Sequence, residues 1–340
     1  MNIESKLILT SKNRETGVNL YTFVLTYPRV ILAEVNTHRA LSRNTASSRA
    51  IPAKKQRQRV IDDPFVPITI GQNQKGMQAG AELDGWRRFV AINTWKLARY
   101  PNVLASWILE KVGAHKQVVN RIVEPWTWTQ QVMTCTDLNN VFKLRNHPDA
   151  EPHFHELARQ MQEQVEIIHA LFDTVNFDCR ETDGTACSLN ETLPSRGVFR
   201  VQMLRPGFWG AGEQDCHLPF IDQRDIWAAK SLEAQEKEFD YRNRFHPGAV
   251  KEPLRVGTAL EALKNISTAR CARVSYYLPE NGQRSDSIRD LELCGRLASS
   301  GHWSPFEHVA TPVSDNAYVG NFRSWKQYRK EYPEEHGGDR

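Results

Sequence analysis

The side chains best suited to chemistry lie together in one short basic stretch. Residues 38–49 contain three arginines, one histidine, one asparagine and four hydroxyl side chains, with almost nothing apolar to bury. Arginine donates paired hydrogen bonds to phosphate oxygens, and serine hydroxyls add single donors. The stretch is therefore either a solvated basic surface loop or a loop that binds a phosphate-bearing ligand.

The elements before this stretch predict how it is positioned. Residues 5–10 and 18–27 alternate enough to form two strands near one edge of a sheet. Residues 28–36 predict a helix with Pro28 in its first turn, and the basic stretch leaves this helix as a loop. Residues 51–80 are rich in Pro, Gln, Gly and Lys, which predicts an extended, irregular segment.

Apolar residues return at helical spacing between residues 79 and 112. Pro101 interrupts this pattern, which predicts two helices there. We expect their tryptophans to pack in the core or at a subunit interface. Further along, Arg145 stands at a predicted helix end shortly before Pro148, where an arginine can simply satisfy the last carbonyl groups.

The rest of the chain alternates helices with polar segments. Residues 174–222 have weak apolar periodicity and predict loops and short strands. The basic and aromatic tail, residues 320–330, predicts a solvated helix that packs its aromatic side chains, with contact to an anionic ligand as the alternative. Helices are expected over residues 115–125, 126–142, 150–172, 223–240, 254–265 and 285–299.

Composition narrows the class of protein. The chain has 340 residues, a net charge of +4 and 25% charged residues, and basic and acidic residues alternate outside the basic stretch, which argues against nucleic acid as an obligatory partner. No run is apolar enough to span a bilayer and the N-terminus lacks a signal-peptide core, so we expect a cytoplasmic protein without a membrane partner.

The six cysteines form no Cys-x-x-Cys pair, and we expect free thiols and no metal. Cys271 and Cys294 have apolar neighbours and are expected to be packing residues. A metal site at Cys216 and His217 is a minor alternative.

The basic stretch resembles the signature of the flavin-dependent thymidylate synthase family, Arg-His-Arg-x-x-Ser-x-Asn-Glu-x-Ser-x-Arg-Tyr. It departs from the signature where the family has Arg, Glu and Tyr, at Thr37, Thr45 and Ala50. The matching positions are His38, Arg39, Ser42, Asn44, Ser47 and Arg49.

Two further stretches strengthen the resemblance. Residues 121–125 and 140–145 are similar to the family's Arg-x-x-Leu-Pro and Asn-Phe-x-x-Leu-Arg, and residues 272–276 with 301–308 are similar to Ala-Arg-Val-Ser and Gly-His-x-Ser/Thr-Pro-Phe-Glu-His. In other members this last block precedes the signature, so the chain resembles a divergent member with circularly permuted or equivalently shuffled segments. We therefore expect the strand after His308 to lie near, or replace, the strand at Tyr21.

The resemblance implies an α+β fold with a mainly antiparallel sheet flanked by helices. It divides the chain into a first part of the catalytic domain (residues 1–170), an insertion (residues 171–255) and a second part of the same domain (residues 256–340). It also implies a homotetramer whose active sites are shared between subunits.

Family members make dTMP from dUMP, so the resemblance implies FAD as cofactor, with NADPH and methylenetetrahydrofolate as co-substrates. Arg145 is then the catalytic residue, because an arginine beside the pyrimidine favours the ring ionised at N3. His302 can alternatively cap the preceding helix. By motif position, the deoxypyrimidine monophosphate is bound by Glu34, Thr45, Ser47, Ser48, Arg49, Arg121 and Arg145. The flavin and the folate are contacted by His38, Arg39, Asn140, Ser275, His302, Ser304 and Glu307.

The departures leave other functions open. Glu34 stands where the family has Gln, and the family's Asn-Ala-Arg flavin contact falls on Thr-Cys-Thr at residues 134–136. Flavin contacts would then be rebuilt by the insertion or by the basic tail. One alternative is a flavin-dependent hydroxymethylase that acts on dUMP or dCMP. Another is a non-catalytic nucleotide-binding relative.

Overall fold

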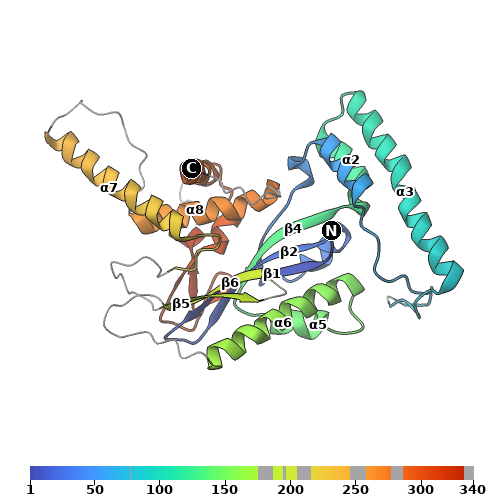
Figure 1. Cartoon of the computed structure of the whole chain (residues 1–340), viewed down its shortest axis with the longest axis horizontal. Coiled ribbons are helices and arrows are strands. Elements are labelled where there is room, and N and C mark those ends of the chain that lie inside the picture. Colours follow the sequence, from blue (N-terminus) through green and yellow to red (C-terminus); the bar gives the residue numbers. More distant parts are fainter. Residues whose placement is uncertain are drawn as a thin grey trace.

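The computed structural model describes a central sheet covered by helices on both faces (Figure 1). The described residues are 1–76, 78–174, 187–193, 197–204, 216–245, 258–276 and 286–332. The sheet has six strands in the order β3-β4-β2-β1-β6-β5. Their bounds are β1 (Glu4–Asn13), β2 (Asn19–Pro28), β3 (Ser42–Thr45), β4 (Trp128–Cys135), β5 (Cys187–Leu193) and β6 (Gly197–Leu204).

Most neighbouring strands are antiparallel, and only β6 runs parallel to its neighbour β1. The predicted α+β class with a mainly antiparallel sheet is therefore confirmed. The expected position of β1 and β2 near a sheet edge is wrong, because β4 pairs with β2 and β6 pairs with β1 on their outer sides. Since β5 and β6 belong to residues 171–255, this segment extends the central sheet, and its description as an insertion stays a prediction.

Two helices pack on one face of the sheet. α5 (Asn139–Arg145) and α6 (Pro152–Thr174) lie on the same side in Figure 1. Alternate β2 residues, including Tyr21, Phe23 and Leu25, point toward them, because successive strand side chains point to opposite faces. Phe154 and Leu157 of α6, spaced one turn apart, complete this apolar core.

The other face is covered by helices from the second half of the chain. α8 (Ala259–Arg273) crosses β4, and its Cys271 packs with Val132 and Val274. The remaining helices are α1 (Leu32–Val35), α2 (Ala53–Asp62), α3 (Gly85–Lys111), α4 (Lys116–Val119), α7 (Gln223–Phe245) and α9 (Ser287–Ser299). The 3-10 helices are η1 (Arg29–Ile31), η2 (Ser48–Ala50), η3 (Asn120–Trp126), η4 (Val274–Tyr276), η5 (Ser304–His308) and η6 (Tyr328–Glu331).

A chain of fully buried polar side chains also runs under this face, and we call it the buried polar chain. Ser11 Oγ lies 2.6 Å from His217 Nδ1, whose Nε2 lies 2.7 Å from Thr22 Oγ1. Thr22 Oγ1 lies 2.7 Å from Thr134 Oγ1, which lies 2.9 Å from His308 Nδ1. These hydrogen bonds satisfy most of the polar atoms that burial removes from water. They join three sheet residues, one each from β1, β2 and β4, to two histidines from the second half of the chain.

Several predicted elements are wrong in detail. Residues 53–62 form α2 instead of an irregular segment, and residues 128–135 form β4 instead of a helix. α3 is one continuous helix with Pro101 inside it. The carbonyl of Leu97, which Pro101 deprives of its helical donor, lies on the exposed side of α3, where water can replace that donor.

The C-terminal segment is not a solvated helix. It forms short strands before η6, and Phe322 and Trp325 are fully buried with Val18 and Leu20. β7 pairs with β10, so the strand after His308 lies near β2 through this cluster but does not replace it. The strands are β7 (Ala310–Pro312), β8 (Tyr318–Val319), β9 (Phe322–Arg323) and β10 (Trp325–Gln327).

The cysteines and the helices bear on the predictions of free thiols and of no membrane span. Cys135, Cys216, Cys271 and Cys294 are buried free thiols, and Cys216 packs in an apolar cluster. No group of three His, Cys, Asp or Glu in the described ranges is placed to hold a metal ion. None of the described helices has the length and apolarity needed to cross a bilayer.

Candidate functional site

The basic stretch folds partly as an edge strand, and this divides its side chains between two faces. Residues 42–45 form β3, which pairs with β4, so the prediction of a loop throughout is wrong. Because strand side chains alternate, Arg43 and Thr45 point to the face of α5 and α6, while Ser42 and Asn44 point to the face of α8. The signature residues therefore take part in two separate clusters.

The first cluster, the Asn44 junction, joins the signature stretch to both parts of the third matched stretch on the α8 face. Asn44 Nδ2 donates to the carbonyl of Cys271 at 2.8 Å and to Ser275 Oγ at 3.1 Å. Ser304 Oγ donates to Asn44 Oδ1 at 3.2 Å. The backbone N–H of Ser47 also donates to the carbonyl of Ser275 at 3.1 Å. Residues more than 220 positions apart in the chain are thus held together by one amide side chain.

The second cluster, the arginine cluster, lies on the opposite face around Arg145. Arg145 Nε donates to His38 Nε2 at 3.0 Å, and Nη1 donates to Glu34 Oε2 at 3.1 Å. The guanidinium lies over the Phe154 ring, 4.9 Å from its centroid. Arg43 donates to the carbonyl of His38 at 3.0 Å and so fixes the backbone at this point. Arg145 is only 22% exposed at its side chain, so its orientation is set by protein contacts.

The electrostatics of the arginine cluster keep His38 neutral. Burial lowers the pKa of His38, and the neighbouring charges of Arg145 and Arg43 lower it further. Since Arg145 Nε is a donor, His38 Nε2 must be the acceptor and its proton sits on Nδ1. The Glu34 carboxylate, which we expected to bind the nucleotide, instead pairs with Arg145.

The predicted phosphate-binding residues lie near one another in the fold. Ser48 is buried, and its carbonyl accepts from Asn120 Nδ2 at 2.7 Å, beside Arg121. Arg49 is exposed, and no described residue bonds its guanidinium. Arg121 is also exposed and pairs with Glu124 at 3.2 Å.

Thr45 lies on the other face of β3, where its Oγ1 accepts a hydrogen bond of 2.5 Å from Gln131. Glu124 also pairs with Arg29, which donates to the carbonyl of Ala46 at 3.1 Å. Through these contacts Arg121 is linked to the basic stretch.

The predicted cofactor residues are more scattered. Arg39, Asn140 and His302 are exposed, and His302 Nδ1 lies 2.8 Å from Ser300 Oγ. Glu307 forms an ion pair with Arg329. Within the described ranges, no hydrogen bond or ion pair joins Asn140 or His302 to the arginine cluster. Arg39, Asn140 and Ser304 each carry a donor suited to the oxygen-rich groups of a flavin nucleotide, and no contact joins the three within the described ranges.

The C-terminal segment contributes contacts that sequence reasoning missed. Gln327 Nε2 donates to Ser42 Oγ at 2.9 Å and to the carbonyl of Glu307 at 3.3 Å. Asn321 Nδ2 donates to Ser42 Oγ at 3.3 Å. The motif matches do not include these amide side chains, and the basic composition of the tail does not point to them.

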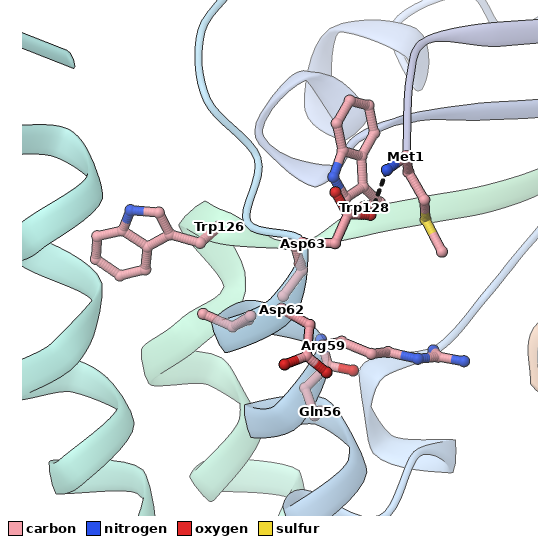
Figure 2. A pocket seen from close by; sticks show the side chains of 9 residues that line it. Met1, Gln56, Arg59, Asp62, Asp63, Trp126 and Trp128 are labelled. Atoms are coloured by element: carbon pink, nitrogen blue, oxygen red, sulfur yellow. Dashed lines mark hydrogen bonds and ion pairs between the residues drawn. The ribbon is translucent and has the colours of Figure 1, made fainter. Parts of the chain in front are cut away.

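A separate cavity of about 220 Å³ lies between α2 and the start of β4 (Figure 2). Gln56 and Arg59 of α2 border it from one side and Trp128 from another. The N-terminal amine of Met1 pairs with Asp63 at its rim. None of the predicted site residues lines this cavity, so it is not the candidate site.

Comparisons with known proteins give distant similarities only. No family model and no curated protein matches the chain. Among solved structures, the chain is similar to the UMP/dUMP methylase PolB from Streptomyces cacaoi. For the structure of PolB with 5-Br UMP bound, the TM-score is 0.39 and the sequence identity is 13%, and the match covers 49% of this chain and 89% of that one. With 5-Br dUMP bound, the TM-score is 0.36 at 17% identity, covering 46% and 72%.

The chain is also similar to thymidylate synthase X from Helicobacter pylori with FAD and dUMP. There the TM-score is 0.29 at 17% identity, covering 43% of this chain and 66% of that one. All three TM-scores are below 0.5. The function proposed below therefore depends on the matched residues and on their contacts in this structure.

Proposed function

We propose that the protein is an FAD-dependent, thymidylate synthase-like enzyme that transfers a one-carbon unit from methylenetetrahydrofolate to C5 of dUMP to give dTMP. The observation that carries the proposal is the Asn44 junction. Asn44 of the signature stretch bonds Ser275 and Ser304, which belong to the third matching stretch. Motifs that are far apart in the sequence and match one family thus meet in space.

Arg145 is the proposed catalytic residue. Its Nε and Nη1 are bonded to His38 and Glu34, while Nη2 has no hydrogen-bond partner among the described residues. The guanidinium is therefore held in a fixed orientation with one nitrogen left to donate. A donor beside the pyrimidine carbonyl stabilises the ring ionised at N3, which raises electron density at C5. Because no cysteine nucleophile is needed, the buried thiols have no catalytic role.

The phosphate of the nucleotide is assigned to Ser47, Ser48, Arg49 and Arg121. Arg49 and Arg121 are exposed cations, and a bidentate guanidinium suits a phosphate. Glu124 holds Arg121 at 3.2 Å, so phosphate binding exchanges or supplements this ion pair. Thr45 is placed with these residues only by motif position.

FAD, when bound, supplies the redox step, with NADPH as the reductant. The residues proposed to hold the flavin and the folate are His38, Arg39, Asn140, Ser275, His302, Ser304 and Glu307. Neutral His38 offers Nδ1–H as a donor, since its Nε2 already accepts from Arg145. Ser275 and Ser304 are fixed by Asn44, which orients their hydroxyls on the same side.

A hydroxymethylase acting on dCMP or dUMP is the second candidate, and the Glu34–Arg145 contact favours it. A carboxylate accepts a hydrogen bond from the N4 amine of cytosine, whereas it repels the O4 carbonyl of uracil. Glu34 lies 3.1 Å from the arginine that is proposed to contact the base. A non-catalytic nucleotide-binding relative is the third candidate, motivated by Thr37 and Thr45 in the signature.

One experiment separates the three candidates. Purified full-length protein is reconstituted with FAD and incubated with NADPH, methylenetetrahydrofolate and either dUMP or dCMP, and the nucleotide product is weighed by mass spectrometry. We expect dUMP to gain a methylene increment. A hydroxymethyl increment, or turnover of dCMP alone, would favour the second candidate. Absence of flavin absorbance after reconstitution, together with unchanged nucleotides, would favour the third.

The same proposal includes a homotetramer with shared active sites. An exposed apolar stripe on α3, which lies beside α2 at one side of the molecule, supports an assembly of copies (Figure 1). Trp86 is 72% exposed and does not pack in the core, which leaves a subunit interface as the other of its two expected environments. Stripe residues recur about every turn or two, at Trp86, Val90, Leu97, Leu104 and Trp107. Light scattering of the purified protein, with Leu97→Glu as the disrupting variant, measures the number of subunits.

A further inference from the structure

A second cavity, of about 290 Å³, lies where β2 begins and β4 ends. Its polar lining comes from four parts of the chain, and we call it the strand-end cavity. Thr16 lies just before β2, Asn19 and Tyr21 belong to β2, Thr136 and Asp137 to the β4–α5 connection, Asn139 to α5, His169 to α6 and Arg323 to β9. Asp137 adds a carboxylate to the lining; it is exposed, and its Oδ1 accepts from the backbone N–H of Asn139 at 3.0 Å. Asn139 and Arg145 are the two ends of α5, so the cavity lies about 9 Å along this helix from the proposed catalytic arginine.

Arg323 is placed at this cavity by a direct contact with Thr136. The backbone N–H of Arg323 donates to Thr136 Oγ1 at 3.1 Å. Two residues earlier, Asn321 donates to Ser42 of the signature strand, which ties the same turn to β3. The C-terminal segment thus places Arg323 beside Thr136, the residue that follows the buried Thr134 and Cys135.

The Arg323 side chain is half-buried, yet no hydrogen bond or ion pair holds its guanidinium within the described residues. Other half-buried arginines are bonded: Arg145 pairs with Glu34, Arg273 with Asp290 and Arg329 with Glu307. Partial burial of an unpaired cation costs solvation energy. An anionic ligand in the cavity would recover that energy.

Three further polar side chains of the cavity are bonded to one another. Asn19 Nδ2 donates to the Tyr21 hydroxyl at 2.9 Å, while Asn19 Oδ1 is buried and unbonded. Tyr21 shares its hydroxyl with His169 Nε2 at 2.7 Å. Burial raises the pKa of Tyr21 to about 12, so this hydroxyl stays neutral. These bonds hold the Asn19 amide, the Tyr21 hydroxyl and the His169 ring in fixed orientations at the cavity.

We propose that Arg323 supplies the guanidinium that pairs with a phosphate of the flavin dinucleotide in the strand-end cavity, in place of an arginine at position 136. The inference rests on the proposed function, because that function names the cofactor. It assigns a binding role to the C-terminal segment, and it accounts for Thr136 at a position where the resembled family has an arginine that contacts the flavin.

The test is a binding titration and needs no turnover. FAD and riboflavin are titrated separately into wild-type protein, Arg323→Ala, Arg323→Lys and the double variant Arg323→Ala with Thr136→Arg, with flavin fluorescence as the readout. Lys326→Ala is the matched control, since it removes a nearby cation of the same segment that lines no part of the cavity. The melting temperature of each variant checks folding, and the bond to Thr136 survives Arg323→Ala because it uses the backbone N–H.

We expect Arg323→Ala to raise the Kd for FAD about tenfold to a hundredfold, as for a lost charge-assisted hydrogen bond, and to change the Kd for riboflavin less than about twofold. Arg323→Lys should retain part of the affinity, and Thr136→Arg should restore most of it in the Arg323→Ala background. Equal FAD affinity of wild type and Arg323→Ala, or an equal loss for riboflavin, would overturn the role of Arg323 alone. Failure of the wild type to bind FAD would overturn the proposed function and, with it, this role.

Discussion

Replacement of Asn44 by alanine tests whether the Asn44 junction holds the candidate site together. The side chain is bonded to three groups, the Cys271 carbonyl at 2.8 Å, Ser275 Oγ at 3.1 Å and Ser304 Oγ at 3.2 Å. Each such bond contributes about 1 kcal/mol net, and the bond to exposed Ser304 contributes least. We therefore expect Asn44→Ala to lower the free energy of unfolding by about 2–3 kcal/mol.

Equilibrium urea denaturation followed by tryptophan fluorescence measures this loss. Asn140→Ala is the matched stability control, because Asn140 is exposed on α5 and its amide has no partner in the described part of the chain. Asn44→Asp is a second variant: it keeps the acceptor for Ser304 but places an oxygen against the Cys271 carbonyl, so we expect at least the same loss. A loss below about 0.5 kcal/mol in both Asn44 variants would refute the junction as a structural link.

Three further predictions concern the arginine cluster, a buried histidine and a buried ion pair. Arg145→Lys removes the two-pronged contact with Glu34 and His38, so turnover should fall about 10²–10³-fold with unchanged melting temperature, and near-normal turnover would contradict the catalytic role. Burial lowers the pKa of His308 to about 3, so the unfolded chain binds its proton first as pH falls below about 6.5. Stability should therefore drop by about 1.4 kcal/mol per pH unit more in wild type than in His308→Gln between pH 6 and 4, and equal slopes in urea denaturation would contradict this. Asp290 is fully buried and accepts from Arg270 at 3.1 Å, so Asp290→Ala should cost about 3–5 kcal/mol in urea denaturation, whereas the exposed Asp286→Ala should cost about 1 kcal/mol as a lost helix cap.

Two elements were predicted correctly for different reasons. α6 shows apolar residues at helical spacing because only one side packs on the sheet. β2 is buried on both faces, and its β-branched and aromatic residues predicted a strand. β4 was missed because both of its faces are buried, so Val132 and Met133 are adjacent apolar residues and the alternation of a strand is lost. The spacing of three between Phe322, Trp325 and Tyr328 imitates a helix, although β9 and β10 are too short to show alternation.

The candidate site was predictable only where a motif match existed. Arg145 was assigned by resemblance, because its local sequence equally fits an arginine at a helix end. Its contacts with Glu34 and His38 join residues more than 100 positions apart, which no local pattern reports. The Ser42 contacts from Asn321 and Gln327 were missed for the same reason.

The buried polar chain has a consequence for how the sheet assembles. Thr22 and Thr134 face each other across β2 and β4, and a slip of one residue would turn either hydroxyl to the apolar α6 face. A misregistered pairing then leaves hydroxyl and imidazole groups buried without partners, at about 1–3 kcal/mol for each group. His217 and His308 come from the second half of the chain. The correct register therefore gains these hydrogen bonds only after that half has packed on the sheet. We therefore expect an isolated first half to sample several strand pairings, and the complete chain to select one.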